Sequence, residues 1–175
     1  MSLNHETSPG IWLVTYKKGA SESFLDYNTV VEEALCFGWV DSLPRSLDES
    51  KTMLYFAPRK PKSGWSKLNK DRVERILAAG KMQPAGLAKI EAAKLDGSWS
   101  KLDAVDALEV PDDLANALGG YPQARENWDQ FPPSTRRGIL EWILNAKRPE
   151  TRRQRVEETV RLAGLNERAN QWKRS

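Results

Sequence analysis

A single histidine and a single cysteine occur among the 175 residues, and their scarcity removes several classes of site. Because His5 lies in a polar N-terminal segment, histidine-based catalytic triads and histidine-rich metal sites are nearly excluded. Cys36 has no partner for an internal disulfide, and the apolar residues around it indicate a buried, inert thiol. We therefore expect no metal site and no cofactor.

Long apolar segments are also missing. No run approaches the roughly 20 residues that span a bilayer, and the first ten residues lack the basic and apolar regions of a signal peptide. Hydrophobic residues make up 39% of the chain, charged residues 29%, and the mean hydropathy is -0.63. These values are typical of a soluble protein with a charged surface, so we expect a cytoplasmic protein without membrane insertion.

The length suits one domain, or one domain with a helical appendage. The predicted fold class is α+β: a small mixed β-sheet with packed helices and an all-helical C-terminal part. Turn signals and composition predict four segments: a flexible leader or remnant of expression cloning at 1–10, an α+β core domain at 11–100, an acidic linker at 101–110 and a helical region at 111–175.

Apolar periodicity places the elements within these segments. In the core domain we predict strands at 11–16, 39–43 and 52–57, the last two as a hairpin, and helices at 27–37, 70–79 and 84–95. Asp26 and Asn69 are the expected N-caps of the first two helices, and Gly38 suits the position after the first. Beyond Pro111 we predict helices at 112–118, 122–130 and 138–146, and a basic helix from residue 149.

Charge is placed unevenly along the chain, although the net charge is only +3. Residues 56–76 hold seven Lys or Arg and two acids, residues 103–113 hold five acids and no base, and residues 134–175 hold eleven Lys or Arg and five Glu. Basic segments of this kind favour anionic partners, but most charged helix faces are merely solvated.

The most distinctive stretch is the proline-fixed cationic loop at residues 58–66. It leads into a helix, where backbone amides and the helix dipole favour an anion. Its candidate ligand-binding residues are Arg59, Lys60, Lys62, Ser63, Trp65 and Ser66. The alternative is a surface loop whose lysines lie over the sheet, with Trp65 as a packing anchor. The loop lacks the glycine and lysine pattern of a nucleotide P-loop.

Trp39 and Asp41 share one face of a predicted strand. They either form the walls of a pocket with Trp65, into which Arg59 or Lys62 points, or serve the fold, with Trp39 in the core and Asp41 paired to Arg59. No paired carboxylates, no nucleophile with a base and no metal spacing accompany them, so no catalytic residue is assigned.

The C-terminal helices carry a third candidate surface. Arg136, Arg137, Arg152 and Arg153 are candidate polyanion-binding residues that would track phosphates or an acidic protein surface. Alternatively, Glu141, Glu150, Glu157 and Glu158 pair with them as an ordinary solvated face. The absence of a helix-turn-helix pattern argues against specific DNA recognition.

Several longer stretches resemble a known family. They are WLVTYKKG at 12–19, EEALCFGWVDS at 32–42, FAPRKPKSGWSKLNKDRVERI at 56–76, MQPAGLAKIEAAKLDGSW at 82–99, VPDDL at 110–114 and PPSTRRGILEWILNAKRPETRRQRVEETV at 132–160. Together they resemble the YdeI or OmpD-associated family of bacteriocin-protection proteins over nearly the whole chain after residue 10. The resemblance implies an α+β fold with a helical C-terminal part, a bacterial protein of stress resistance and a porin-linked partner. Family members usually have a longer segment before residue 12.

Three hypotheses of function follow. The first is a non-enzymatic cytoplasmic protection or interaction protein that binds an anionic small molecule or peptide at the cationic loop. The second is a nucleic-acid-associated module that uses the basic C-terminal helices. The third is an enzyme of unrecognised chemistry, which requires polar groups that converge around Asp41 in a deep pocket.

Overall fold

The computed structural model describes residues 3–20 and 24–171 and divides into two compact units, Met1–Lys101 and Leu102–Ser175. Each unit has its own hydrophobic core and is described by itself. In the described part of the chain, no helix has both the length and the apolar character needed to cross a bilayer.

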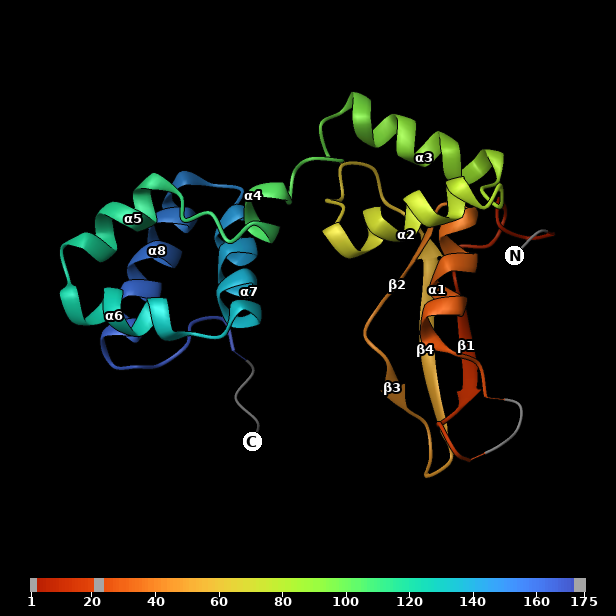
Figure 1. Ribbon diagram of the computed structural model, residues 1–175, viewed down its shortest axis with the longest axis horizontal. Helices are drawn as coiled ribbons and strands as arrows, with labels where there is room; N and C mark the ends of the chain where they lie inside the picture. Colours follow the sequence, from red (N-terminus) through yellow and green to blue (C-terminus); the bar gives the residue numbers. More distant parts are fainter. Residues whose placement is uncertain (1–2, 21–23, 172–175) are drawn as a thin grey trace. The chain divides into compact units, whose positions relative to one another are not determined.

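The first unit is built on a four-stranded sheet (Figure 1). Its strands are β1 (Ile11–Tyr16), β2 (Trp39–Asp41), β3 (Arg45–Ser46) and β4 (Lys51–Pro58). The α+β class is confirmed, but each of these pairings is antiparallel, whereas a mixed sheet was expected. The reason is that β4 lies between β1 and β2, which run parallel to each other without being neighbours.

Alternation along the strands gives the sheet two different faces. Leu54 and Phe56 of β4 point into the core, and the register places Leu13 and Ile11 opposite them on β1. The intervening residues of β1 point to the other face, where the side chain of Trp12 is 47% exposed. The sheet is therefore covered on one side only by the rest of its unit.

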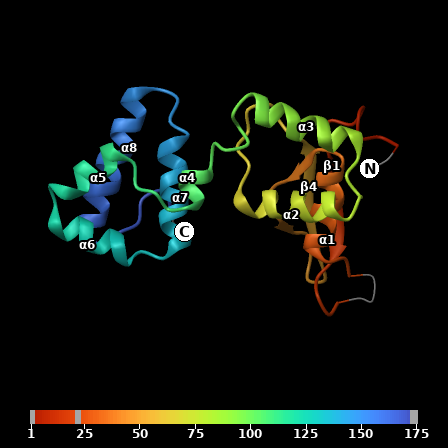
Figure 2. The same cartoon turned by 45° about the horizontal axis from the view of Figure 1, so that its top comes forward.

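Three helices provide that cover: α1 (Tyr27–Cys36), α2 (Lys67–Ala78) and α3 (Pro84–Leu95). Helix α1 lies along β1 and β4, and α2 and α3 lie at the end of the sheet opposite β3 (Figures 1 and 2). The buried core between sheet and helices comprises Val31, Ala34, Leu35, Cys36, Trp39, Leu54, Phe56, Trp65, Val73, Ile76, Ile90 and Ala93.

Local signals explain where these helices begin and end. The Asp26 carboxylate accepts a hydrogen bond from the Thr29 amide and caps α1 as predicted, and Gly38 follows the helix with φ +72°. Helix α2 begins at Lys67, three residues earlier than predicted, because Ser66 and not Asn69 is its N-cap. The strand predicted over 39–43 ends at Asp41.

The N-terminal residues 3–10, expected to be a flexible leader, pack against the rest of the first unit. The His5 ring lies 4.9 Å from the Phe37 ring, and the His5 carbonyl accepts a hydrogen bond from Trp39 Nε1 at 3.2 Å. These contacts join residues more than thirty positions apart, so no local pattern in the leader indicates them.

The second unit is all helical, as predicted. Its helices are α4 (Asp103–Asp106), α5 (Asp112–Gly119), α6 (Pro122–Gln130), α7 (Pro133–Leu144) and α8 (Pro149–Gly164). Trp128, Leu114 and Ile139 lie at the centre of its core and are fully buried. Helix α7 begins at Pro133, five residues before the predicted start at residue 138.

The acidic segment 101–110, expected to be a linker, contributes to this second core. It contains α4, and its Leu102 and Val105 are each only 5% exposed. Leu102 and Val105 are three positions apart, a helical spacing that places both on the buried face of this turn. Asp103 is exposed, whereas the side chain of Asp106 is only 9% exposed and pairs with Arg137.

Candidate anion-binding site

The cationic loop is held in place by the sheet. The Arg59 amide donates a hydrogen bond to the Gly38 carbonyl at 3.0 Å, which extends the pairing of β2 with β4 by one residue. Pro58 and Pro61 restrict the backbone on either side. The Ser63 hydroxyl donates to the Lys60 carbonyl at 2.7 Å and closes the turn between them. The loop therefore has a defined conformation before any ligand arrives.

Arg59 is buried beneath this loop and is only 6% exposed. Its guanidinium stacks on the Trp65 ring, with 3.8 Å between the guanidinium carbon and the ring centroid, and Nη2 donates to the Gly64 carbonyl. Its Nε and Nη1 are buried and have no hydrogen-bond partner among the described residues. A cation held out of water with two free donors is costly unless an anion reaches it.

Electrostatics agree with this geometry. Burial lowers the pKa of Arg59 from 12.5 to about 10, and the Asp41 carboxylate opposes that shift. The neighbouring charge of Asp41 is therefore too weak to offset the loss of water around the guanidinium. An anion beside Nε or Nη1 would supply the missing compensation.

A small cavity of about 70 Å³ adjoins Arg59. Its lining residues come from the cationic loop and from the region of α3: Arg59, Lys60, Pro61, Lys62, Ser63, Trp65, Lys89, Ala92, Ala93, Asp96 and Ser98. Four of them are cations and one is an acid. The space suits a single anionic group with a few waters and excludes a nucleoside.

Asp96, the acid in this lining, is already engaged. It accepts hydrogen bonds from Ser98, one of them from the Ser98 amide at 2.9 Å, and these bonds hold its pKa below the usual value. The backbone and charge of Lys62 add smaller effects in the same direction. Asp96 thus fixes Lys62, whose φ of 60° lies in the left-handed region, and opposes only part of the positive field.

The structure brings together five of the predicted ligand-binding residues, namely Arg59, Lys60, Lys62, Ser63 and Trp65. Ser66 instead caps α2 through its hydroxyl. Lys89, Asp96 and Ser98 were missed because helix packing brings them to the loop from about thirty positions away. Lys89 lies on the face of α3 nearest Gly38. In the sequence alone, nothing distinguishes it from the other surface lysines.

Trp39 and Asp41 lie outside the cavity. Trp39 is 2% exposed and fills the core of the first unit. Asp41 accepts a hydrogen bond from the Tyr27 hydroxyl at 2.6 Å. Burial, and then this hydrogen bond, raise the pKa of Tyr27 to about 12. Both residues therefore serve the fold, and Asp41 acts on Arg59 only through its charge.

Arg72 provides an internal comparison because it is also buried, at 3% exposure. Its Nη1 donates to the Asn69 side chain at 2.9 Å and its Nη2 to the Asn28 side chain at 2.6 Å. The bond to Asn28 ties α2 to α1, whereas the bond to Asn69 lies within α2. The Nε of Arg72 is buried without a hydrogen-bond partner among the described residues. Arg72 thus has two side-chain acceptors, whereas Arg59 has one backbone carbonyl.

The predicted polyanion surface on the C-terminal helices is largely paired. Arg152 contacts Asp113 through two hydrogen bonds of 2.7 and 2.9 Å. Arg137 contacts both Asp106, at 2.7 Å, and Glu141, at 2.8 Å. Arg153 lies 3.8 Å from two glutamates. The Nε of Arg136 is buried and has no hydrogen-bond partner among the described residues. The carboxylates compensate much of the positive charge on this surface.

Among the described residues, no group of three or more His, Cys, Asp or Glu is placed to hold a metal ion.

Comparisons with known proteins divide the chain as the two cores do. Residues 1–89 match a family described as a domain of unknown function (DUF8412). Residues 107–164 match the family described as bacteriocin-protection, YdeI or OmpD-associated. The expected resemblance to the latter family is confirmed for the helical unit, whereas it was expected over nearly the whole chain. No curated protein and no solved structure matches the chain.

Proposed function

The chain belongs to the DUF8412 family through residues 1–89 and carries a bacteriocin-protection family segment at 107–164, and we propose that it is a non-enzymatic, cytoplasmic binding protein with a protection role. Its ligand is an anionic small molecule or a peptide with an exposed anionic group. That group binds in the cavity beside Arg59.

The observation that carries this proposal is the buried Arg59 guanidinium with two unpartnered donors at a cavity. An anionic oxygen there would accept charge-assisted hydrogen bonds, which are about twice as strong as neutral ones. Lys62 and Lys89 line the same cavity and would add charge at its mouth. The cavity is too small for more than the charged end of the ligand, so the rest of the ligand lies outside it.

Inorganic phosphate is the simplest probe of this site. At a concentration tenfold above its dissociation constant, a ligand that binds only the folded state stabilises that state by about 1.4 kcal/mol. We expect phosphate to raise the thermal midpoint of the full chain and to change the fluorescence of Trp65. The replacements Lys62→Ala and Lys89→Ala should each weaken phosphate binding severalfold.

Lys81→Ala is the matched control, because Lys81 is exposed and does not line the cavity. It removes the same charge and should leave phosphate binding unchanged. Equal weakening by all three lysine replacements would indicate a general field effect and would reject a built site.

A further inference from the structure

The face of the sheet that α1, α2 and α3 leave open carries aromatic side chains and cations. We define the open sheet face by Trp12, Val14, Tyr16, Arg45, Lys51 and Tyr55. Their strand register places Trp12 opposite Tyr55 and Tyr16 opposite Lys51, all on the side away from Leu54 and Phe56. Arg45 joins this face from β3, where it lies opposite Met53.

Two aromatic positions follow one another along β1. Trp12 and Tyr55 form the first, with ring centroids 5.1 Å apart and ring planes tilted by 51°. Tyr16 forms the second, four residues further along the strand, or about 13 Å at the usual rise per residue. Trp12 is 47% exposed, so its ring is open to a ligand.

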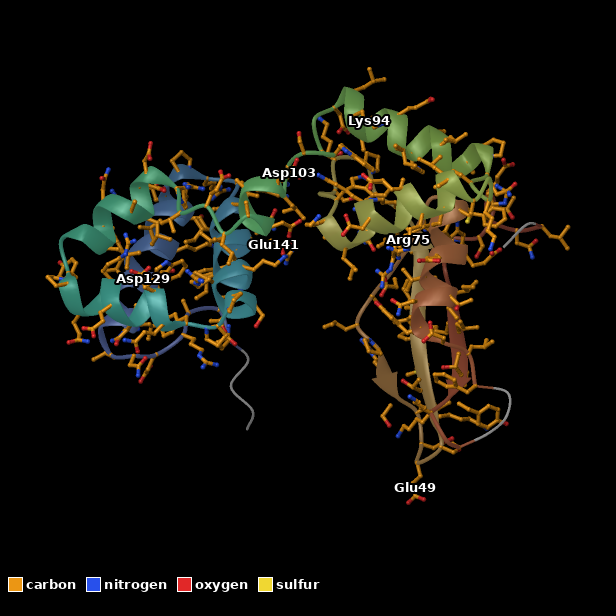
Figure 3. All side chains as sticks on the ribbon, in the orientation of Figure 1. Glu49, Arg75, Lys94, Asp103, Asp129 and Glu141 are labelled. Atoms are coloured by element: carbon orange, nitrogen blue, oxygen red, sulfur yellow. The ribbon has the colours of Figure 1, made fainter. Side chains whose placement is uncertain are left out.

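A cation accompanies each position. The Arg45 guanidinium carbon lies 5.4 Å from the Trp12 ring centroid, and Lys51 Nζ lies 5.6 Å from the Tyr16 ring centroid. The strand positions that point to this face carry no acid. Nearby Asp48 accepts from the amides of Ser50 and Lys51, and its charge also interacts with that of Lys51. Glu49 projects from the tip of the turn (Figure 3).

Aromatic rings that each lie beside a cation favour one kind of partner. Single-stranded nucleic acid offers bases that stack on aromatic rings and phosphates that pair with cations. A protein surface of ordinary composition would bury Arg45 and Lys51 against few compensating groups, at a desolvation cost. A duplex keeps its base faces stacked internally, where these rings cannot reach them.

We propose that the open sheet face binds single-stranded nucleic acid, with bases stacked on Trp12, Tyr55 and Tyr16 and phosphates held by Arg45 and Lys51. This site shares no residue with the lining of the anion-binding cavity, which begins at Arg59, directly after the end of β4. It also differs from the C-terminal arginines, which are largely paired.

The test is fluorescence anisotropy of labelled oligo(U) and oligo(dT), about 12 nucleotides long, titrated with the full chain at low and moderate salt. We expect Trp12→Ala to weaken binding about tenfold or more, because base stacking on one ring is typically of this size. Trp12→Phe keeps a ring and should bind within a few-fold of the wild type. Lys51→Glu should abolish binding and leave the fold intact.

Tyr121→Ala is the control, since Tyr121 is 63% exposed in the helical unit and belongs to no part of the open sheet face. It should not change the affinity. The proposal is overturned if the wild type binds neither oligonucleotide, or if Trp12→Ala binds as well as the wild type. Self-association that Trp12→Ala abolishes, without oligonucleotide binding, would assign the face to a second copy of the chain and also overturn the proposal.

Discussion

Arg59 and Arg72 show how two arginines of similar burial come to differ in role. Arg72 donates to two asparagine side chains and keeps one buried donor, Nε, without a partner among the described residues, whereas Arg59 keeps two such donors. A buried charge without compensation lowers stability. Arg59 therefore contributes less to the fold than its position suggests, in keeping with the proposal that it binds an anion at the cavity.

The hydrogen bond between Tyr27 and Asp41 predicts how the stability of the protein depends on pH. The pKa of Tyr27 is raised to about 12 in the folded protein, above its ordinary value of 10.0. The neutral phenol is thus favoured by folding: its contribution to stability is fully present below pH 10 and is lost as the pH rises towards 12. We expect an ultraviolet titration of Tyr27→Phe to lack one phenol that ionises near pH 12.

The companion variant separates the two causes of that shift. Asp41→Asn removes the charge beside the phenol and should lower the pKa of Tyr27, but not fully to 10.0, because burial is the larger cause. Glu49→Gln, at the exposed turn before β4, is the control and should leave the titration unchanged. An Asp41→Asn titration identical to that of the wild type would show that the hydrogen bond does not form.

Replacing a glycine by alanine should have opposite effects on stability in helices α3 and α7. A Cβ added to Gly86 in α3 would lie 2.3 Å from the Cys36 carbonyl oxygen, so this glycine lets α3 approach the end of α1. A Cβ added to Gly138 in α7 meets nothing within 4 Å. We expect Gly86→Ala to lower the free energy of unfolding by about 1–3 kcal/mol, and Gly138→Ala to raise it by about 0.5–1 kcal/mol.

Chemical denaturation of the two variants tests this pair. Helix propensity alone would make both replacements stabilising, so a gain in stability from Gly86→Ala would contradict the close packing of α3 on α1.

Most helices were predictable because their signals are local. Pro84, Pro122 and Pro149 each stand at the first turn of a helix, and Asp26 caps α1, as the sequence indicates. Helix α2 was placed three residues late because Ser66 and Asn69 are both good caps, and only the path of the loop decides between them. The position of β4 within the sheet depends on long-range pairing that no local pattern records.

Of the residues that line the candidate site, the sequence predicted only those that the cationic loop contributes. Proline and lysine spacing identified Arg59, Lys60 and Lys62, but Lys89 and Ser98 reach the cavity through the packing of α3 and the turn after it. Trp39 was assigned to a pocket wall as one of two interpretations, and its 2% exposure follows from long-range packing. Sequence reasoning therefore found one wall of the cavity and not the other.

The two units have separate cores, which predicts that each responds to its own mutations. Leu114 is fully buried among residues of the helical unit, and Val73 is 1% exposed among residues of the sheet unit. We expect Leu114→Ala to cost about 2–5 kcal/mol within the helical unit. Hydrogen exchange of the full chain should then increase over residues 102–171 and stay unchanged over residues 24–98.

Val73→Ala is the reciprocal variant and should increase exchange in the sheet unit only. Faster exchange throughout the chain in both variants would show that the two cores unfold as one cooperative body.

The central claim is that Arg59 serves an anion and not the fold, and calorimetric titration of Arg59→Met with inorganic phosphate tests it most directly. Methionine keeps an apolar stem over Trp65 and removes the charge. The expected result is saturable phosphate binding by the wild type and none by Arg59→Met, whose free energy of unfolding is unchanged or up to about 2 kcal/mol higher. Phosphate binding by Arg59→Met with wild-type affinity would contradict the claim.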